Sequence, residues 1–191
     1  MAEVKIINNL FPYNDRFKMR DRKQINMLVL HSTETPTLEL AREYGKQEIY
    51  EESSTGNAAH YYIDLDGKIY RYVEDNRIAF HVVGYNEQSI GIEIVNKGRY
   101  PHWFYNNNQF PAEEFKKEQI TALLNLLNNL KVRFPGISRL ERHSVLDQRT
   151  IPAEDNSDVL IRRRIDPGPQ FPWEYVQNFF ELPYISDADT V

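Results

Sequence analysis

The segment from Arg142 to Trp173 contains side chains from which a metal site could be built. It holds a single histidine, His143, and an aspartate, Asp166, that directly precedes a Pro-Gly-Pro sequence. Three consecutive arginines, residues 162–164, stand just before that aspartate. Imidazole and carboxylate groups are ligands for divalent cations such as zinc. A structural role is the alternative for Asp166, because Asp-Pro-Gly is also a common turn sequence, and the arginines could belong to a solvated loop.

His31 is a second candidate ligand, because it follows the apolar run INMLVL of residues 25–30. This run is rich in branched residues and predicts a buried strand. The sequence STETP comes next, in which Thr35 could cap a helix with Pro36 at its first position. His31 is thus expected where a strand gives way to a helix, at a sheet edge where ligands bind. The alternative is a buried histidine bonded to a neighbouring loop.

Glu93 lies in the middle of a predicted strand, SIGIEIVN, at residues 89–96. Side chains alternate between the two faces of a strand, so Ile90, Ile92 and Ile94 share one face and Glu93 shares the other with Gly91 and Val95. Burying a carboxylate is costly unless a positive or hydrogen-bonding group faces it. Glu93 therefore requires such a partner, unless it is on an edge strand and faces solvent.

The chain has no cysteine, so any metal ligands must be imidazole or carboxylate. His31, His143 and Asp166 together are two histidines and one carboxylate. With a fourth position left for water, this is the ligand set of a hydrolytic zinc site.

The elements around these candidates predict an α/β (α+β) fold with a mixed sheet flanked by helices. Residues 59–73 predict a β-hairpin with its turn at Asp66 and Gly67, and residues 113–134 predict the longest helix. The proline-rich final third predicts irregular chain before a short helix at residues 173–182 and a mobile tail at 183–191. His60, in the first hairpin strand, is expected to be structural more than a ligand. The aromatic segment 98–110 could form the wall of a groove or could equally cap the core.

Composition limits the class of protein. A length of 191 residues predicts one domain, with a core spanning about residues 25–182. The net charge of -5 gives no global positive field for nucleic acid, so no nucleic-acid partner is expected. No apolar run reaches 18 residues and the N-terminus lacks a secretory signal. As written, the chain is expected to be cytoplasmic, or exported if a leader has been removed.

Several segments resemble a known family. LVLHSTETP, AAHYYIDLDGKIYRYV, AFHVVG, SIGIEIVN, RHS and RRRIDPGPQFPW occur in the order found in AmpD-type N-acetylmuramyl-L-alanine amidases. That family is related to phage lysozymes of the amidase class and to peptidoglycan-recognition proteins. The resemblance covers most of residues 25–175 and implies a single zinc amidase domain.

The resemblance also implies roles for particular residues. Zinc would be held by His31, His143 and Asp166, and Glu93 stands where the family has its catalytic glutamate. Arg164 occupies the position of a catalytic lysine; it can stabilise an oxyanion but is a poor proton donor. The implied reaction is hydrolysis of the amide between N-acetylmuramic acid, including its anhydro form, and the L-alanine of peptidoglycan stem peptides. Muropeptides or intact peptidoglycan would be the partners.

The chain departs from the family pattern at three places. Residues 144–165 separate His143 from Asp166, a longer connection than in the shorter family members, and 146–160 are expected to form a loop at the mouth of the site. Phe80 replaces a tryptophan common in relatives, next to His81; both residues, with His60, are candidate substrate contacts. Ala59 replaces a tyrosine of the phage relatives. These changes bear on substrate preference more than on reaction type.

A function of another class is a recognition module that binds muropeptides without cleaving them. Binding-only relatives usually lose a metal ligand, whereas this chain keeps the complete set and Glu93. The sequence therefore favours an enzyme. Within that class, muropeptide recycling and cleavage of intact wall both remain open.

Overall fold

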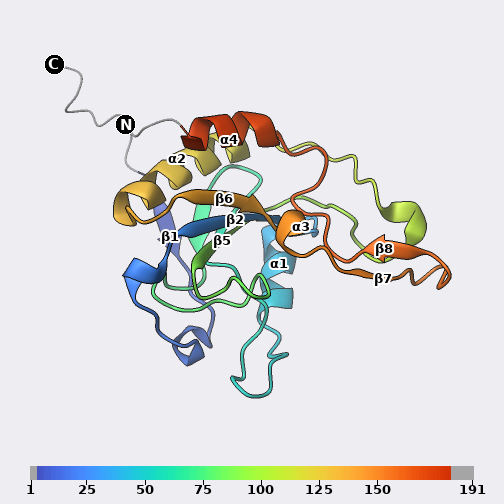
Figure 1. The fold of residues 1–191 in the computed structure, drawn as a ribbon, viewed down its shortest axis with the longest axis horizontal. Helices are drawn as coiled ribbons and strands as arrows, with labels where there is room; N and C mark the ends of the chain where they lie inside the picture. Colours follow the sequence, from blue (N-terminus) through green and yellow to red (C-terminus); the bar gives the residue numbers. More distant parts are fainter. Residues whose placement is uncertain (1–3, 182–191) are drawn as a thin grey trace.

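In the computed structural model, which describes residues 4–181, six strands form one mixed sheet in the order β1-β4-β3-β5-β2-β6 (Figure 1). Strands β2, β3, β5 and β6 are parallel to one another, whereas β4 is antiparallel to β3 and pairs with β1 in parallel. The strands of this sheet are β1 Ile6–Asn8, β2 Met27–Ser32, β3 Tyr61–Ile63, β4 Ile69–Arg71, β5 Ser89–Ile94 and β6 Arg139–Arg142. The predicted mixed sheet flanked by helices is confirmed, and the predicted mobile tail, 183–191, lies outside the described residues.

Helices cover both faces of the sheet. The long helix α2, Lys117–Arg133, and the last helix α4, Trp173–Glu181, pack side by side on one face (Figure 1). Helix α1, Leu38–Gly45, lies on the other side, and the single turn α3, His143–Leu146, follows β6. Three 3-10 turns lie in the connections, at Asn14–Arg16, Arg22–Gln24 and Asn106–Asn108. No helix within residues 4–181 is long and apolar enough to cross a membrane.

The alternation predicted for β5 divides the sheet into a core face and a polar face. Ile90, Ile92 and Ile94 are fully buried in the cluster that α2 and α4 complete. Burying an isoleucine side chain contributes about 1.5–3 kcal/mol, so this face holds the sheet against the helices. Ser89, Gly91 and Glu93 point the other way. The register of the parallel pair β2–β5 sets His31 opposite Glu93, so both side chains share the polar face.

Some element boundaries differ from the predictions. Helix α1 is capped by Thr37, whose hydroxyl accepts a hydrogen bond from the Leu40 amide at 3.2 Å, and not by Thr35. Thr35 instead forms an isolated antiparallel bridge with Asn96, in which its amide donates to the Asn96 carbonyl. The hairpin strands and α2 are confirmed but shorter than predicted. Strand β6 was not predicted, because only Leu140 of its four residues is buried.

The connection between His143 and Asp166 is more regular than predicted. It contains a two-stranded hairpin formed by β7, Thr150–Pro152, and β8, Leu160–Arg162. This hairpin projects from the body of the fold beside the segment of residues 98–110 (Figure 1). Hydrogen bonds from the Glu154 amide to the Phe104 carbonyl and from the Asn106 amide to Asp155 join the two segments. None of residues 146–160 lines the pocket of the site, so the loop expected at its mouth is instead this hairpin, joined to the segment 98–110.

Candidate active site

His31 and His143 meet because β2 and β6 are parallel neighbours. Their register pairs Leu30 with Arg142, so the residue that follows each of these positions is a histidine. The carboxyl ends of parallel strands lie at the same edge of a sheet, where ligands commonly bind. His31 is the fifth residue of β2, and His143 begins α3 directly after β6. Strand order thus places two imidazoles side by side although 111 residues separate them in the chain.

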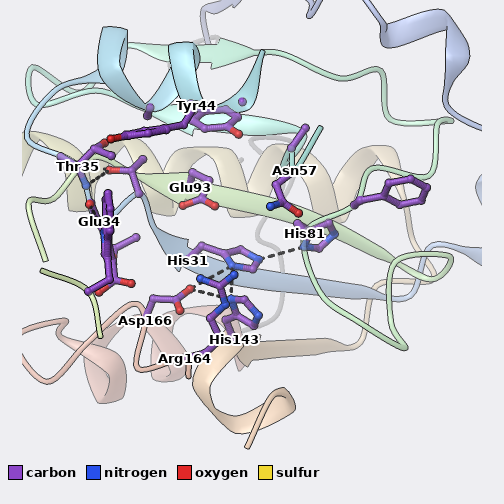
Figure 2. A pocket seen from close by; sticks show the side chains of 18 of the residues that line it. His31, Glu34, Thr35, Tyr44, Asn57, His81, Glu93, His143, Arg164 and Asp166 are labelled. Atoms are coloured by element: carbon purple, nitrogen blue, oxygen red, sulfur yellow. Dashed lines mark hydrogen bonds and ion pairs between the residues drawn. The ribbon is translucent and has the colours of Figure 1, made fainter. Parts of the chain in front are cut away.

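Asp166 completes a cluster of three buried ligand atoms (Figure 2). The Nδ1 atoms of His31 and His143 are 3.0 Å apart, and Asp166 Oδ2 lies 3.2 Å from the first and 2.9 Å from the second. Ligand atoms at zinc–ligand distances of about 2.0–2.1 Å in a tetrahedral site lie about 3.3 Å from one another. The three atoms therefore have almost the spacing that a zinc ion requires, and the donor set fits the metal.

The electrostatics of the cluster favour the ligand forms of these side chains. Burial, together with the neighbouring His143, lowers the pKa of His31 to about 4, so its imidazole is neutral at pH 7. Burial tends to raise the pKa of Asp166, but the neighbouring imidazole groups of His143 and His31 outweigh it and hold that pKa well below its usual value. Within residues 4–181, Asp166 Oδ1 is buried without a hydrogen-bond partner. A cation at this cluster would compensate the buried carboxylate.

Glu93 faces the same space from the neighbouring strand (Figure 2). Burial raises its pKa well above the ordinary value, and the charges of Asp166 and Glu34 add to this effect while Arg164 opposes it. Its Oε2 atom has no hydrogen-bond partner in the described part of the chain. The partner that the sequence required for this carboxylate is therefore not another protein side chain, and a carboxyl group with a raised pKa is suited to acid–base catalysis.

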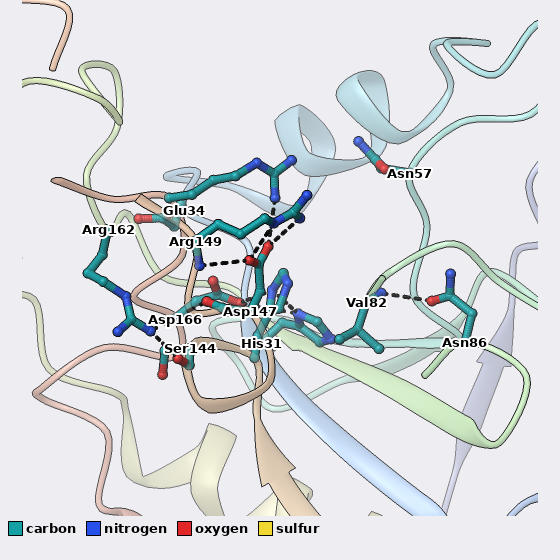
Figure 3. Close-up of polar contacts among 12 residues, drawn as sticks. His31, Glu34, Asn57, Val82, Asn86, Ser144, Asp147, Arg149, Arg162 and Asp166 are labelled. Atoms are coloured by element: carbon teal, nitrogen blue, oxygen red, sulfur yellow. Dashed lines mark hydrogen bonds and ion pairs between the residues drawn. The ribbon is translucent and has the colours of Figure 1, made fainter. Parts of the chain in front are cut away.

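The three arginines before Asp166 have separate roles. Arg162 donates to the Ser144 carbonyl at 2.5 Å, and Arg163 donates to Asp147 at 2.9 Å. Asp147 also accepts two hydrogen bonds from Arg149, which hold its pKa well below its usual range (Figure 3). The first two arginines thus fix the connecting segment. Only Arg164 of this run lines the pocket beside the cluster of His31, His143 and Asp166.

A buried ion pair fixes the segment that carries Arg164 and Asp166. The guanidinium of Arg99 is fully buried and donates to both carboxylate oxygens of Glu34, at 2.6 and 2.7 Å. It also donates to the backbone carbonyls of Arg162 and Arg163, both at 3.2 Å. Glu34 follows β2 and lines the pocket. Arg99 therefore joins the turn after His31 to the chain just before Arg164.

Replacing Arg99 with methionine should destabilise the fold by about 3–5 kcal/mol, because it leaves the Glu34 carboxylate buried without its cation. Urea unfolding of the purified variant measures this change. Replacing Glu34 with glutamine in the same chain should restore part of the loss, since the buried charge is then removed as well. A loss below about 1 kcal/mol in the single variant would place the pair among weak surface ion pairs and contradict the role given to Arg99.

The cluster lies at the base of a pocket of about 350 Å³. Aromatic side chains line it, among them Phe80, Tyr44 and Trp103, and the rings of the last two are 5.8 Å apart. Trp103 is held by a hydrogen bond from its indole nitrogen to the Glu34 carbonyl. The aromatic segment 98–110 thus contributes to a groove, as the sequence suggested. A pocket of this volume is within the size range of small-ligand sites.

Among the candidate substrate contacts, Phe80 and His81 line the pocket and His60 does not. His60 is fully buried; its Nδ1 accepts from the Gly91 amide and its Nε2 lies 3.0 Å from the Arg77 carbonyl. His60 therefore lies away from the pocket, and its contacts agree with the structural role that its strand position favoured. Sequence patterns did not reveal Glu34, Arg99 and Trp103, whose contacts span distant segments.

Comparisons with known proteins agree with this geometry. The family model described as N-acetylmuramoyl-L-alanine amidase matches residues 21–169. The amidase LysC from Clostridium intestinale URNW is 22% identical with a TM-score of 0.65, covering 94% of this chain and 99% of its own. AmiD from E. coli is 20% identical with a TM-score of 0.60, covering 82% of this chain and 57% of its own.

Peptidoglycan recognition protein-LE shares the fold at 19% identity and a TM-score of 0.57, covering 80% of this chain and 90% of its own. No curated protein sequence gives a significant match. The similar structures establish the fold, and the family model covers most of the chain, including His31, Glu93, His143 and Asp166. The chain therefore belongs to the N-acetylmuramoyl-L-alanine amidase family and is an amidase of that type.

Proposed function

We propose that the chain is a zinc-dependent amidase, with zinc held by His31, His143 and Asp166. The convergence of these three ligand atoms, on the face of the sheet that also carries Glu93, is the observation that supports this most strongly. Bound zinc supplies a Lewis acid, which lowers the pKa of a water molecule to about 7 and polarises the amide carbonyl. The bond cleaved joins the lactyl group of N-acetylmuramic acid to L-alanine of the stem peptide.

Glu93 is proposed as the general base and then the general acid. It takes a proton from the attacking water and delivers that proton to the nitrogen of the leaving L-alanine. Both steps need a carboxyl group whose pKa is close to the working pH, and burial moves the pKa of Glu93 in that direction. A guanidinium group offers hydrogen-bond donors and no acceptor, so Arg164 cannot replace Glu93 as the base.

Arg164 is proposed to stabilise the negative charge that develops on the amide oxygen. Replacing Arg164 with alanine should lower kcat by about 10²–10³-fold, as expected when an oxyanion-stabilising group is lost. Replacing it with lysine should retain most of the activity, because the positive charge remains. Steady-state kinetics of the two variants test this proposal, with zinc content as a control. A lysine variant as slow as the alanine variant would show that the planar guanidinium is needed and contradict a role in charge alone.

The pocket suits a small muropeptide. Phe80 and Trp103 offer aromatic surfaces against which the apolar face of a sugar or a peptide side chain could pack. AmiD was crystallised with anhydro-N-acetylmuramic acid-L-Ala-D-gamma-Glu-L-Lys, and AmpDh3 from Pseudomonas aeruginosa with anhydromuramic pentapeptide. These complexes support the inclusion of anhydro-muropeptides among the substrates.

Metal removal and restoration test the zinc dependence. Chelation should abolish hydrolysis of a soluble muropeptide, and addition of one equivalent of zinc should restore it. Magnesium should not restore activity, because it prefers oxygen ligands and octahedral geometry. Full activity in metal-free protein, verified by elemental analysis, would overturn the proposal. Zinc binding without hydrolysis would favour a module that only recognises muropeptides.

A further inference from the structure

Ser89, Gly91 and Glu93 lie along the polar face of β5, and the first two contact His81. Ser89 Oγ lies 3.2 Å from His81 Nε2. At Gly91, a Cβ atom would lie 2.6 Å from two atoms of the His81 ring, so the absence of a side chain there leaves the space that the imidazole occupies. The third residue is Glu93. His81 is therefore seated on the strand that carries the catalytic glutamate.

The other nitrogen of the His81 ring faces a metal ligand. His81 Nδ1 lies 3.0 Å from His31 Nε2, with the two rings in an edge-to-face arrangement. The backbone at His81 is also fixed, because the Val82 amide donates to Asn86 Oδ1 (Figure 3), and so does the His81 amide. Both ring nitrogens of His81 thus contact protein groups, which leaves none for a substrate.

Ser89, His81 and His31 form a series of hydrogen bonds, and the contacts of Ser89 determine which group donates in each bond. Ser89 Oγ lies 2.7 Å from the Tyr85 carbonyl, which only accepts, so the serine hydroxyl must donate there. Ser89 Oγ then accepts from His81, which places the His81 proton on Nε2. A neutral imidazole with its proton on Nε2 has a lone pair on Nδ1, and this atom accepts from His31 Nε2. His31 is left with its lone pair on Nδ1.

We infer that Ser89 and His81 are positioning residues that fix the His31 tautomer, so that Nδ1, the atom facing His143 and Asp166, is free to bind the metal. This inference rests on the proposed zinc site and deepens it. Partners of this kind around metal-ligating histidines orient the ring, and their loss typically weakens metal binding by about 10–100-fold. His81, expected to contact substrate, thus acts on the metal ligand instead.

Two replacements of His81 that differ by one methylene separate this role from simple packing. In His81→Asn, the amide oxygen can take the place of Nδ1 and still accept from His31 Nε2. In His81→Gln, the amide group lies near the position of Nε2, where it can bond Ser89 but not His31. Glutamine is closer to histidine in size. Packing alone therefore predicts that the glutamine variant is the better replacement, and the tautomer role predicts the opposite.

The first measurement is the zinc dissociation constant of each variant, by competition with a chromophoric chelator. We expect the asparagine variant to stay within a few-fold of the unchanged chain and the glutamine variant to bind about 10–100-fold more weakly. Urea unfolding of the metal-free proteins controls for loss of fold. Equal affinities, or tighter binding by the glutamine variant, would overturn the inference. Absence of zinc binding by the unchanged chain would instead refute the proposed zinc site.

A spectroscopic measurement tests the tautomer directly in the unchanged chain. Long-range ¹H–¹⁵N correlation spectra distinguish protonated from bare nitrogens in each histidine ring. Before and after zinc is added, His31 and His81 should both carry their proton on Nε2. A His31 proton on Nδ1 in the metal-free protein would contradict the inference, whatever the variants show. Replacing Ser89 with alanine should allow the two His81 tautomers to mix.

Discussion

Replacing Glu93 with glutamine should lower kcat by about 10²–10⁴-fold, the contribution usual for a general acid–base group, while zinc content and stability stay close to those of the unchanged chain. Glutamine has the same shape as glutamate but neither accepts the proton of the attacking water nor delivers it to the leaving amine. Because Glu93 is not one of the three converging ligands, its replacement should leave the metal in place. KM should change little if the residue acts in the chemical step alone.

Steady-state kinetics on a soluble muropeptide, with elemental analysis of the same preparations, measures this effect. Glu114→Gln is a matched control, because Glu114 is exposed and does not line the pocket. Retention of more than about a tenth of the activity in the Glu93 variant would exceed what loss of a general base allows and would exclude the role. A loss of zinc would instead show that Glu93 also supports the metal site.

The second large effect concerns the metal ligands. Replacing His143 with alanine should remove both zinc and activity, because two ligands cannot hold the ion in a site that needs three protein ligands. Zinc should raise the melting temperature of the unchanged chain, since it binds the folded state, and this rise should disappear in the variant. Asp166→Ala should give the same result, because Asp166 Oδ2 contacts both imidazoles.

His102→Ala is a suitable control for these variants. His102 is an exposed histidine that stacks on Tyr105 and does not line the pocket. It should keep one zinc per chain and full activity. Equal zinc content in the His143 and His102 variants, measured after dialysis against a weak chelator, would remove His143 from the ligand set.

The strongest local patterns predicted the fold well. The alternation in residues 89–94 predicted both the buried isoleucine face and the isolated position of Glu93, because a period of two allows only one division of those side chains. Helix α2 was equally clear from its leucine spacing. Strand β6 was not recognised: it forms an edge of the main sheet and buries one apolar side chain, so tertiary pairing with β2, not local pattern, makes it a strand.

The residues of the site could be predicted from the sequence, but the contacts that hold them in place could not. A shared site could be proposed for His31, His143 and Asp166 because imidazole and carboxylate groups are metal ligands. The resemblance to a known family then assigned all three to one zinc site. The Arg99–Glu34 pair joins residues 65 positions apart, and neither residue type signals burial from sequence. His81 illustrates the same limit, because only the fold shows that its two ring nitrogens face Ser89 and His31.

Product analysis by mass spectrometry tests the central proposal most directly. Zinc-loaded chain, chelator-treated chain and the Glu93→Gln variant are each incubated with soluble anhydro-muropeptide and, separately, with intact peptidoglycan sacculi. We expect only the zinc-loaded unchanged chain to release a stem peptide with a free L-alanine amine from the soluble substrate. Release from sacculi as well would extend the substrates to intact wall. Absence of that peptide from both substrates, with zinc bound, would contradict the proposed amidase function.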